Sequence, residues 1–133
     1  MRLGLAVGPT EEDDRIGKGI VDAAFHVHKN LGPGLLESVY EACLCHELQK
    51  REMRFERQAK LSIEYDGVVL DDDLRLDVLV ERSVICELKA VESVSDLHVA
   101  QVLTYLRLSG LRLAYLINFI VRMFRRSIKR IGL

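Results

Sequence analysis

The sequence predicts an α/β domain in which helices flank a mixed central β-sheet. Two amphipathic helical patterns come first, a series of strand patterns follows, and one further helix precedes a buried-type strand. A helix between two strands is the usual connection of a parallel pair, whereas tight turns connect antiparallel pairs. Because both kinds of connection are expected, the sheet should contain both parallel and antiparallel neighbours.

The first helix is expected near the N-terminus. Residues 1–12 show no regular pattern and should form a loose, disordered end, which leaves residues 13–133 as one domain. Apolar side chains then recur at helical spacing as far as Leu31, and Asp13 or Asp14 could cap this helix at its start.

A second helix should follow after a short break. The Gly-Pro-Gly run at residues 32–34 stops the first helix, because proline prevents its continuation and glycine permits a turn. The helical pattern resumes over residues 35–51. Its apolar side is expected to contain Leu36, Val39, Cys43, Leu44 and Leu48.

The middle of the chain reads as strands and turns. The pair Asp66-Gly67 lies between two apolar runs and predicts a hairpin turn. The acidic run at residues 71–73 reads as another turn. Two apolar strands, at residues 74–80 and 84–90, then flank a short polar break and should form a central hairpin.

The last part of the chain should add a helix, a buried strand and a basic end. Ser93 or Ser95 could cap the helix, and Gly110 would end it. Residues 113–119 form an apolar strand pattern, and residues 121–131 a basic strand or helix. The helix would cross over between the central hairpin and the apolar strand, which makes those two strands parallel.

Charged residues inside the central hairpin are the first functional signal. Glu87 and Lys89 share one face of an apolar strand, and Asp77 has a similar setting on the partner strand. Charges are rarely placed there unless they are paired or bind a ligand. If the strands pair, Asp77 approaches Glu87, and Mg²⁺ or Mn²⁺ would relieve the repulsion between the carboxylates. The alternative is that these side chains are solvated on a half-exposed strand.

The charge of the chain is unevenly distributed. The net charge is −1, but residues 97–133 contain seven basic and no acidic residues, whereas the preceding residues contain 12 basic and 20 acidic ones. Such asymmetry favours a surface that binds a polyanion, although a solvated basic helix or strand would explain it too. The basic residues are Arg107, Arg112, Arg122, Arg125, Arg126, Lys129 and Arg130.

Cysteine content and hydropathy argue against other protein classes. The cysteines Cys43, Cys45 and Cys86 are odd in number, and nothing suggests a disulfide-stabilised secreted domain. Residues two apart on a helix do not share a face, so Cys43 and Cys45 read as ordinary thiols rather than ligands of a soft metal. The sequence shows no signal peptide and no apolar run long enough to span a membrane, so a cytoplasmic protein is expected.

Several motifs, in order, resemble one known family. Asp77 with Glu87-Leu88-Lys89 resembles the metal-binding core of the PD-(D/E)XK nuclease superfamily. Gly34-Leu-Leu-Glu37-Ser-Val-Tyr40 resembles the motif of the GxxExxY proteins within that superfamily. The likeness extends over residues 16–130. The chain departs from the pattern at Leu74, Leu76, Ala114 and Ser127, none of which is a carboxylate or the lysine of the core.

The resemblance implies a restriction-endonuclease-like core that carries a divalent metal. Asp77, Glu87 and the backbone carbonyl of Leu88 would bind Mg²⁺ or Mn²⁺, and Glu37 would complete the metal site. Lys89 would position or deprotonate the attacking water, or stabilise the pentacovalent phosphate.

The resemblance also implies residues around the metal. Gln101 would align water or phosphate at the edge of the site. Tyr40 would either orient the metal-site glutamate or contact substrate, and His28 would either be structural or reach a phosphate. The full set expected to contact substrate or phosphate is Tyr40, Tyr105, His28, Arg125, Arg126, Lys129 and Arg130.

These expectations predict an enzyme that hydrolyses phosphodiester bonds of nucleic acid, with DNA favoured over RNA. The small domain leaves little surface for substrate selection, so homodimerisation or a protein partner could supply it. The alternative is a nucleic-acid-binding or protein-interaction module on the same fold with weak or absent catalysis. A small-molecule phosphoesterase ranks last, because no nucleotide pocket is recognisable in the sequence.

Overall fold

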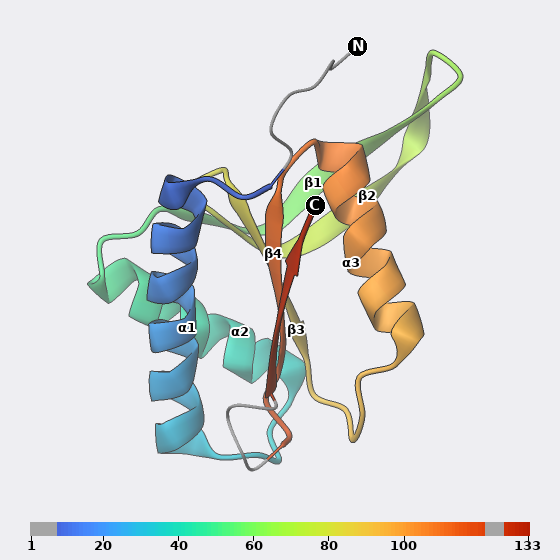
Figure 1. Cartoon of the computed structure of the whole chain (residues 1–133). Helices are drawn as coiled ribbons and strands as arrows, with labels where there is room; N and C mark the ends of the chain where they lie inside the picture. The colour runs from blue at the N-terminus through green and yellow to red at the C-terminus, as the bar shows by residue number, and fades with distance from the viewer. Residues whose placement is uncertain (1–7, 122–126) are drawn as a thin grey trace.

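A mixed sheet with helices on both faces forms the fold (Figure 1). The computed structural model describes residues 8–121 and 127–133. In these residues the elements follow in the order α1 (Glu11–Leu31), α2 (Glu37–Lys50), β1 (Phe55–Tyr65), β2 (Val68–Val80), β3 (Val84–Lys89), α3 (Asp96–Ser109), β4 (Leu113–Asn118) and β5 (Ile128–Gly132).

The strands lie side by side in sequence order, from β1 to β5. The β1–β2, β2–β3 and β4–β5 pairs are antiparallel, whereas β3 and β4 are parallel. The parallel pair is connected by α3, as expected from a helix between two strands. The predicted α/β class, mixed sheet and crossover helix are therefore confirmed.

Two apolar cores lie on opposite faces of this sheet. Helices α1 and α2 cover one face, where Ile20 and Leu44 join a core cluster with Leu88. Helix α3 covers the other face, where Leu106 joins a second cluster with Ile85. Strands β3 and β4 are buried between these layers, which explains why most of their residues are apolar. None of the described helices combines the length and hydropathy needed to cross a membrane.

The start of α1 differs from the prediction. Thr10, not an aspartate, is the N-cap: Asp13 N donates to Thr10 Oγ1 and Thr10 N donates to Asp13 Oδ2, both over 3.0 Å. This reciprocal pair is a capping box, which satisfies backbone donors at the helix start. The helix therefore begins two residues before the expected domain boundary at residue 13, while residues 1–7 lie outside the described residues.

The apolar side of α2 was predicted correctly only in its later part. Leu44 and Leu48 are fully buried as expected, whereas Leu36 is 74% exposed and Val39 is exposed, so these two predictions were wrong. The inward face also carries Glu41, a buried carboxylate that the hydrophobic pattern could not assign to the core. A charge on the inner face is possible because it is paired there, as described below.

The β1–β2 hairpin is longer than predicted and extends beyond the other strands (Figure 1). Its turn lies at Asp66 and Gly67, which both have positive φ, so this prediction is confirmed. The acidic run at residues 71–73 is not a turn but part of β2. Asp73 is held there by a 3.0 Å ion pair with Lys60 on β1.

Candidate active site

The site begins where β2 separates from β3. Their described residue pairs end at Val78 opposite Cys86. At the next residue, carboxylate side chains accept the hydrogen bonds of the backbone amides across the two strands. Asp77 N donates to Glu87 Oε2 over 2.7 Å, and Leu88 N donates to Asp77 Oδ2 over 2.8 Å. Each carboxylate is therefore fixed by the backbone of the opposite strand.

Both carboxylates lie in an unfavourable environment for negative charge. Glu87 is only 5% exposed; burial, followed by the nearby charge of Asp77, raises its pKa to about 8. The pKa of Asp77 is also raised, mainly by burial and further by the charge of Glu41. A cation bound between these groups would lower the free energy of their charged forms.

Lys89 and Glu37 belong to different elements and interact through their charges. Lys89 is the last residue of β3, and Glu37 is the first residue of α2. Burial raises the pKa of Glu37, the positive charge of Lys89 opposes that rise, and the charge of Asp77 adds to it. The backbone of Ala90 also lowers the pKa of Glu37. Charges on α2, β2 and β3 thus act on one another, although Glu37 does not join Asp77 and Glu87 in a described group of three that could hold a metal ion.

Three further residues beside this site were missed in the sequence. Glu41, one turn after Glu37 on α2, is 8% exposed. Its Oε1 accepts a 2.8 Å hydrogen bond from Gln58 Nε2, and its Oε2 accepts a 3.1 Å bond from Arg57 Nε. The spacing of the two glutamates places both on one side of the helix. That spacing was the available signal for Glu41, whereas nothing in β1 singled out Arg57 or Gln58.

Helix α3 carries Tyr105, whose hydroxyl is affected by the charges of the carboxylate pair. Tyr105 is 7% exposed, and its pKa is raised by burial and then by the charges of Glu87 and Asp77. Gln101 lies one turn earlier on α3 and is exposed. This arrangement leaves Gln101 accessible from solvent on the helix that carries Tyr105.

A comparison with protein-family models gives evidence that is independent of this geometry. A family model of the PD-(D/E)XK nuclease superfamily matches residues 14–131. The chain belongs to the PD-(D/E)XK nuclease superfamily. Comparisons with curated proteins and with solved structures found no match. The superfamily resemblance predicted from the core motif is therefore confirmed.

Tyr40 has a structural position in this PD-(D/E)XK protein. It is fully buried and stacks on Phe119 with ring centroids 4.6 Å apart. Its hydroxyl donates to Gly32 O over 2.7 Å and accepts from Leu35 N over 3.1 Å. The expectation that Tyr40 contacts substrate was wrong, because its ring and hydroxyl are both occupied inside the fold. It instead fixes the loop that leads into α2 and Glu37.

His28 is also part of the interior. It is 8% exposed, and its Nε2 lies 2.6 Å from the carbonyl oxygen of Val121. A carbonyl only accepts, so Nε2 carries the proton and donates this bond. The expectation that His28 reaches a phosphate was therefore wrong, and the structural alternative holds.

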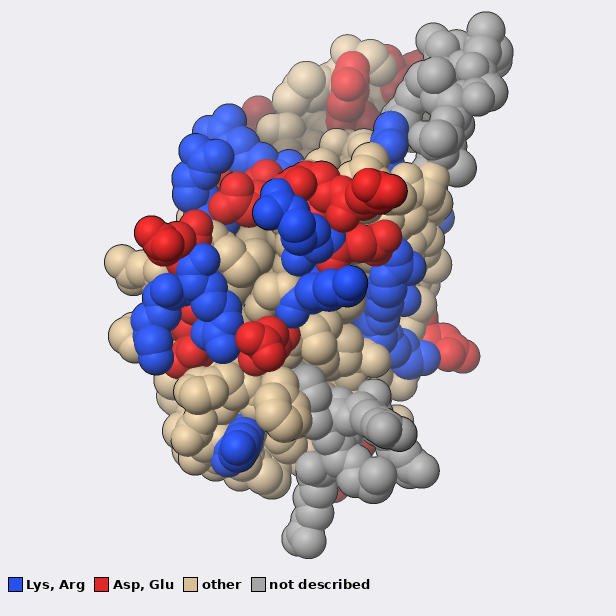
Figure 2. Space-filling model, turned by 60° about the vertical axis from the view of Figure 1, so that its left-hand side comes forward, with Lys and Arg blue, Asp and Glu red and all other residues tan. Residues whose placement is uncertain are grey.

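The expected basic contacts do not form one described cluster. Arg130 Nη2 lies 2.6 Å from Asp14 Oδ1 on α1 in a half-exposed ion pair, so a phosphate would compete with Asp14 for this guanidinium. Lys129 is exposed on β5, whereas Arg125 and Arg126 lie outside the described residues. On the side that Figure 2 presents, Lys and Arg alternate with Asp and Glu rather than forming a continuous basic surface.

The carboxylate pair fits a hard divalent cation. Mg²⁺ is usually held by one or two carboxylates together with waters and substrate phosphates, so Asp77 and Glu87 suffice as protein ligands. Among residues 8–121 and 127–133, no group of three or more His, Cys, Asp or Glu is arranged so that it could hold a metal ion. A cation at the carboxylate pair would therefore take its remaining ligands from water or substrate phosphates.

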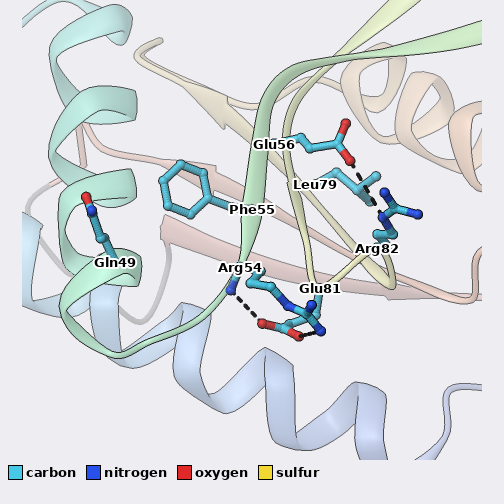
Figure 3. Close-up of a pocket in the computed structure, with 7 residues that line it drawn as sticks. All are labelled: Gln49, Arg54, Phe55, Glu56, Leu79, Glu81 and Arg82. Atoms are coloured by element: carbon cyan, nitrogen blue, oxygen red, sulfur yellow. Dashed lines mark hydrogen bonds and ion pairs between the residues drawn. The ribbon is translucent and has the colours of Figure 1, made fainter.

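A hollow elsewhere on the protein is not the candidate site. It has a volume of about 640 Å³ and lies by the turn between β2 and β3 (Figure 3). Its charged groups pair with one another: Arg54 Nη2 lies 3.7 Å from Glu81 Oε1, and Arg82 Nε lies 3.9 Å from Glu56 Oε1. The hollow is lined by Gln49, Arg54, Phe55, Glu56, Leu79, Glu81 and Arg82, none of which belongs to the carboxylate pair.

Proposed function

We propose that this protein is a metal-dependent nuclease that hydrolyses phosphodiester bonds of DNA with Mg²⁺ or Mn²⁺. Membership of the PD-(D/E)XK nuclease superfamily supports the class of reaction. The observation that carries the proposal is the reciprocal pair of hydrogen bonds that fixes the buried carboxylates of Asp77 and Glu87 side by side. The motif that ends at Tyr40 further favours a place among the GxxExxY proteins.

The metal would be held by residues of three elements. Asp77 and Glu87 are the principal ligands, the Leu88 carbonyl is a further oxygen donor, and Glu37 completes the site directly or through water. When bound, the cation lowers the pKa of a coordinated water and stabilises negative charge on the scissile phosphate. The protein contributes fixed carboxylates, so little reorganisation is needed when cation and substrate arrive.

Lys89 supplies a positive charge beside the reacting phosphate. It follows Glu87 by two residues on the same strand, and alternation along a strand places both side chains on one face. Its ammonium would donate hydrogen bonds to the attacking water or to the phosphate oxygens as charge develops there. Gln101, exposed on α3, would align the same water or phosphate through its amide.

Substrate binding away from the metal is expected to depend on the C-terminal cations. Lys129 and Arg130 are exposed on β5, and Arg125 and Arg126 complete the expected set of cations. Contacts of lysine and arginine with phosphates release counterions, so affinity should fall steeply as the salt concentration rises. A second copy of the chain or a protein partner would enlarge the surface available for DNA.

The proposal is tested by incubating the protein with supercoiled plasmid, labelled single-stranded DNA and labelled RNA, each with Mg²⁺, Mn²⁺ or chelator. Lys89→Ala should lose nearly all cutting, whereas the matched control Lys18→Ala, an exposed lysine on α1, should cut like wild type. Metal-dependent cutting of DNA in excess of RNA would support the proposal. Metal-independent DNA binding without cutting would favour the binding module instead.

A further inference from the structure

Gln58 has an unusual backbone conformation for a strand residue. Its φ is +51°, in the left-handed region, although it lies inside β1. A residue with a Cβ pays roughly 1–2 kcal/mol for this conformation. The other described non-glycine residues with positive φ lie in turns between elements rather than within a strand; they are Glu52, Asp66, Glu81 and Arg82.

At this position, beside the candidate active site, the side chains of β1 and β2 change from one face of the sheet to the other. Phe55 packs against the core under α1 and α2, but Ala59 belongs to the core under α3. On β2, Val78 and Leu76 divide between the two cores in the same way. Residues an even number apart share a face in a regular strand, so both strands change faces at Gln58 and its neighbour across the ladder, Asp77.

The side chain of Gln58 lies beside two carboxylates. Its Nε2 donates to Glu41 Oε1 over 2.8 Å. Gln58 is also the neighbour of Asp77 across the β1–β2 ladder, where its side chain lowers the pKa of the Asp77 carboxyl. The other Glu41 oxygen is held by Arg57, with an ion-pair distance of 3.0 Å. An amide nitrogen carries two hydrogens, so one Gln58 side chain can serve both acceptors.

We infer that Gln58 is a positioning residue of the active site, oriented by Glu41 and Arg57, which holds the Asp77 carboxylate in the direction needed for metal binding. This inference rests on the proposed function. The Leu88 amide fixes one oxygen of Asp77, and Gln58 restrains the carboxylate from the opposite neighbouring strand. Removing a group that hydrogen-bonds a metal ligand without contacting the metal commonly lowers metal affinity 10- to 100-fold.

Replacement by glycine separates this role from a purely structural one. Gln58→Gly removes the amide but suits the left-handed backbone, which offsets part of the loss of the Glu41 hydrogen bond, so the variant should still fold in chelator. Mn²⁺ affinity, measured by calorimetry, should nevertheless fall about tenfold, with a loss of kcat in DNA cleavage. Ser62→Gly, at an exposed position on the same strand, is the matched control and should leave Mn²⁺ affinity unchanged.

A double-mutant cycle tests whether Gln58 acts through this network. Glu41→Gln should itself weaken Mn²⁺ binding, and the double variant with Gln58→Gly should lose less than the two single effects together. A Gln58→Gly protein that binds Mn²⁺ and cuts DNA like wild type would overturn this inference but not the proposed function. A lowered melting temperature with unchanged Mn²⁺ affinity would also overturn it, because it would show that Gln58 has only a structural role. A wild type that neither binds Mn²⁺ nor cuts would overturn the proposed function and this inference with it.

Discussion

Asp77 and Glu87 hold each other's strands: the amide of Asp77 bonds the Glu87 carboxylate over 2.7 Å, while the Asp77 carboxylate accepts from Leu88 N over 2.8 Å. Neither side chain can rotate away without leaving a buried backbone donor unsatisfied, which would cost about 1–3 kcal/mol. Their mutual repulsion is therefore relieved by a proton or by a cation, not by movement. This relationship leads to the first two predictions.

The metal-free protein should lose stability as the pH rises through the range in which Glu87 ionises. Its folded pKa of about 8 exceeds the ordinary value of 4.5, so the folded state binds more protons than the unfolded state between these values. The stabilisation is complete below about pH 4.5 and is lost as the pH rises to about 8. Thermal unfolding in chelator should therefore give a lower melting temperature at pH 8.5 than at pH 6.

The same measurement on Glu87→Gln isolates the responsible group. Its neutral side chain cannot ionise, so the melting temperature should depend much less on pH over this range. Glu64→Gln, at an exposed position of β1, is the matched control and should keep the wild-type slope. An equal slope in wild type and Glu87→Gln would show that Glu87 is not the titrating group.

Mg²⁺ or Mn²⁺ should stabilise the protein through the carboxylate pair. A ligand that binds only the folded state at 100 times its Kd adds about 2.7 kcal/mol to the free energy of unfolding. The rise in melting temperature should be larger at pH 8 than at pH 6, because protons compete for Glu87. Asp77→Asn should abolish most of this rise, and a metal effect of full size in that variant would place the metal elsewhere.

Tyr40 should matter for stability rather than for substrate. Tyr40→Phe keeps the ring stacked on Phe119 but leaves Leu35 N and Gly32 O without the hydroxyl. The free energy of unfolding should fall by roughly 1–3 kcal/mol, measured by denaturant titration. Tyr65→Phe, at the exposed hairpin turn, is the matched control and should change little. Unchanged stability together with weakened DNA binding in Tyr40→Phe would restore the substrate role.

Close packing between α1 and β4 gives a prediction on the fold itself. A Cβ at Gly17 would clash with the Tyr115 hydroxyl, whereas at Gly19 it would meet the flexible Met53 side chain at 2.7 Å. Gly17→Ala should therefore lower the free energy of unfolding by roughly 1–3 kcal/mol, and Gly19→Ala should lower it by less. Tyr115→Phe should recover part of the Gly17→Ala loss, because it removes the nearest atom. Equal losses in the two alanine variants would show that this contact is not close.

Local signals in the sequence predicted much of the fold. Asp66-Gly67 and Gly110 act through their own backbone preferences, so the hairpin turn and the end of α3 could be predicted from neighbouring residues alone. The carboxylate pair could be anticipated because both groups interrupt apolar strands that a short turn connects. These features depend on contacts that are close in sequence.

The remaining features depend on contacts between distant segments. Glu41 is acceptable on the inner face of α2 because Arg57 and Gln58 reach it from β1, and hydrophobic periodicity does not contain that information. The structural positions of Tyr40 and His28 likewise depend on Phe119 and Val121, about 80 to 93 residues further along the chain. The change of faces at Asp77 violates the strict alternation on which strand prediction relies.

The central claim is that Asp77 and Glu87 form the divalent-metal site of a nuclease. Its most direct test is the anomalous X-ray signal of a crystal soaked in Mn²⁺ at pH 8, where both carboxylates are more readily ionised. The account predicts a Mn²⁺ peak in contact with oxygens of both Asp77 and Glu87, and its loss in Asp77→Asn. A wild-type crystal with no peak at this pair, or with Mn²⁺ bound only at another site, would contradict it.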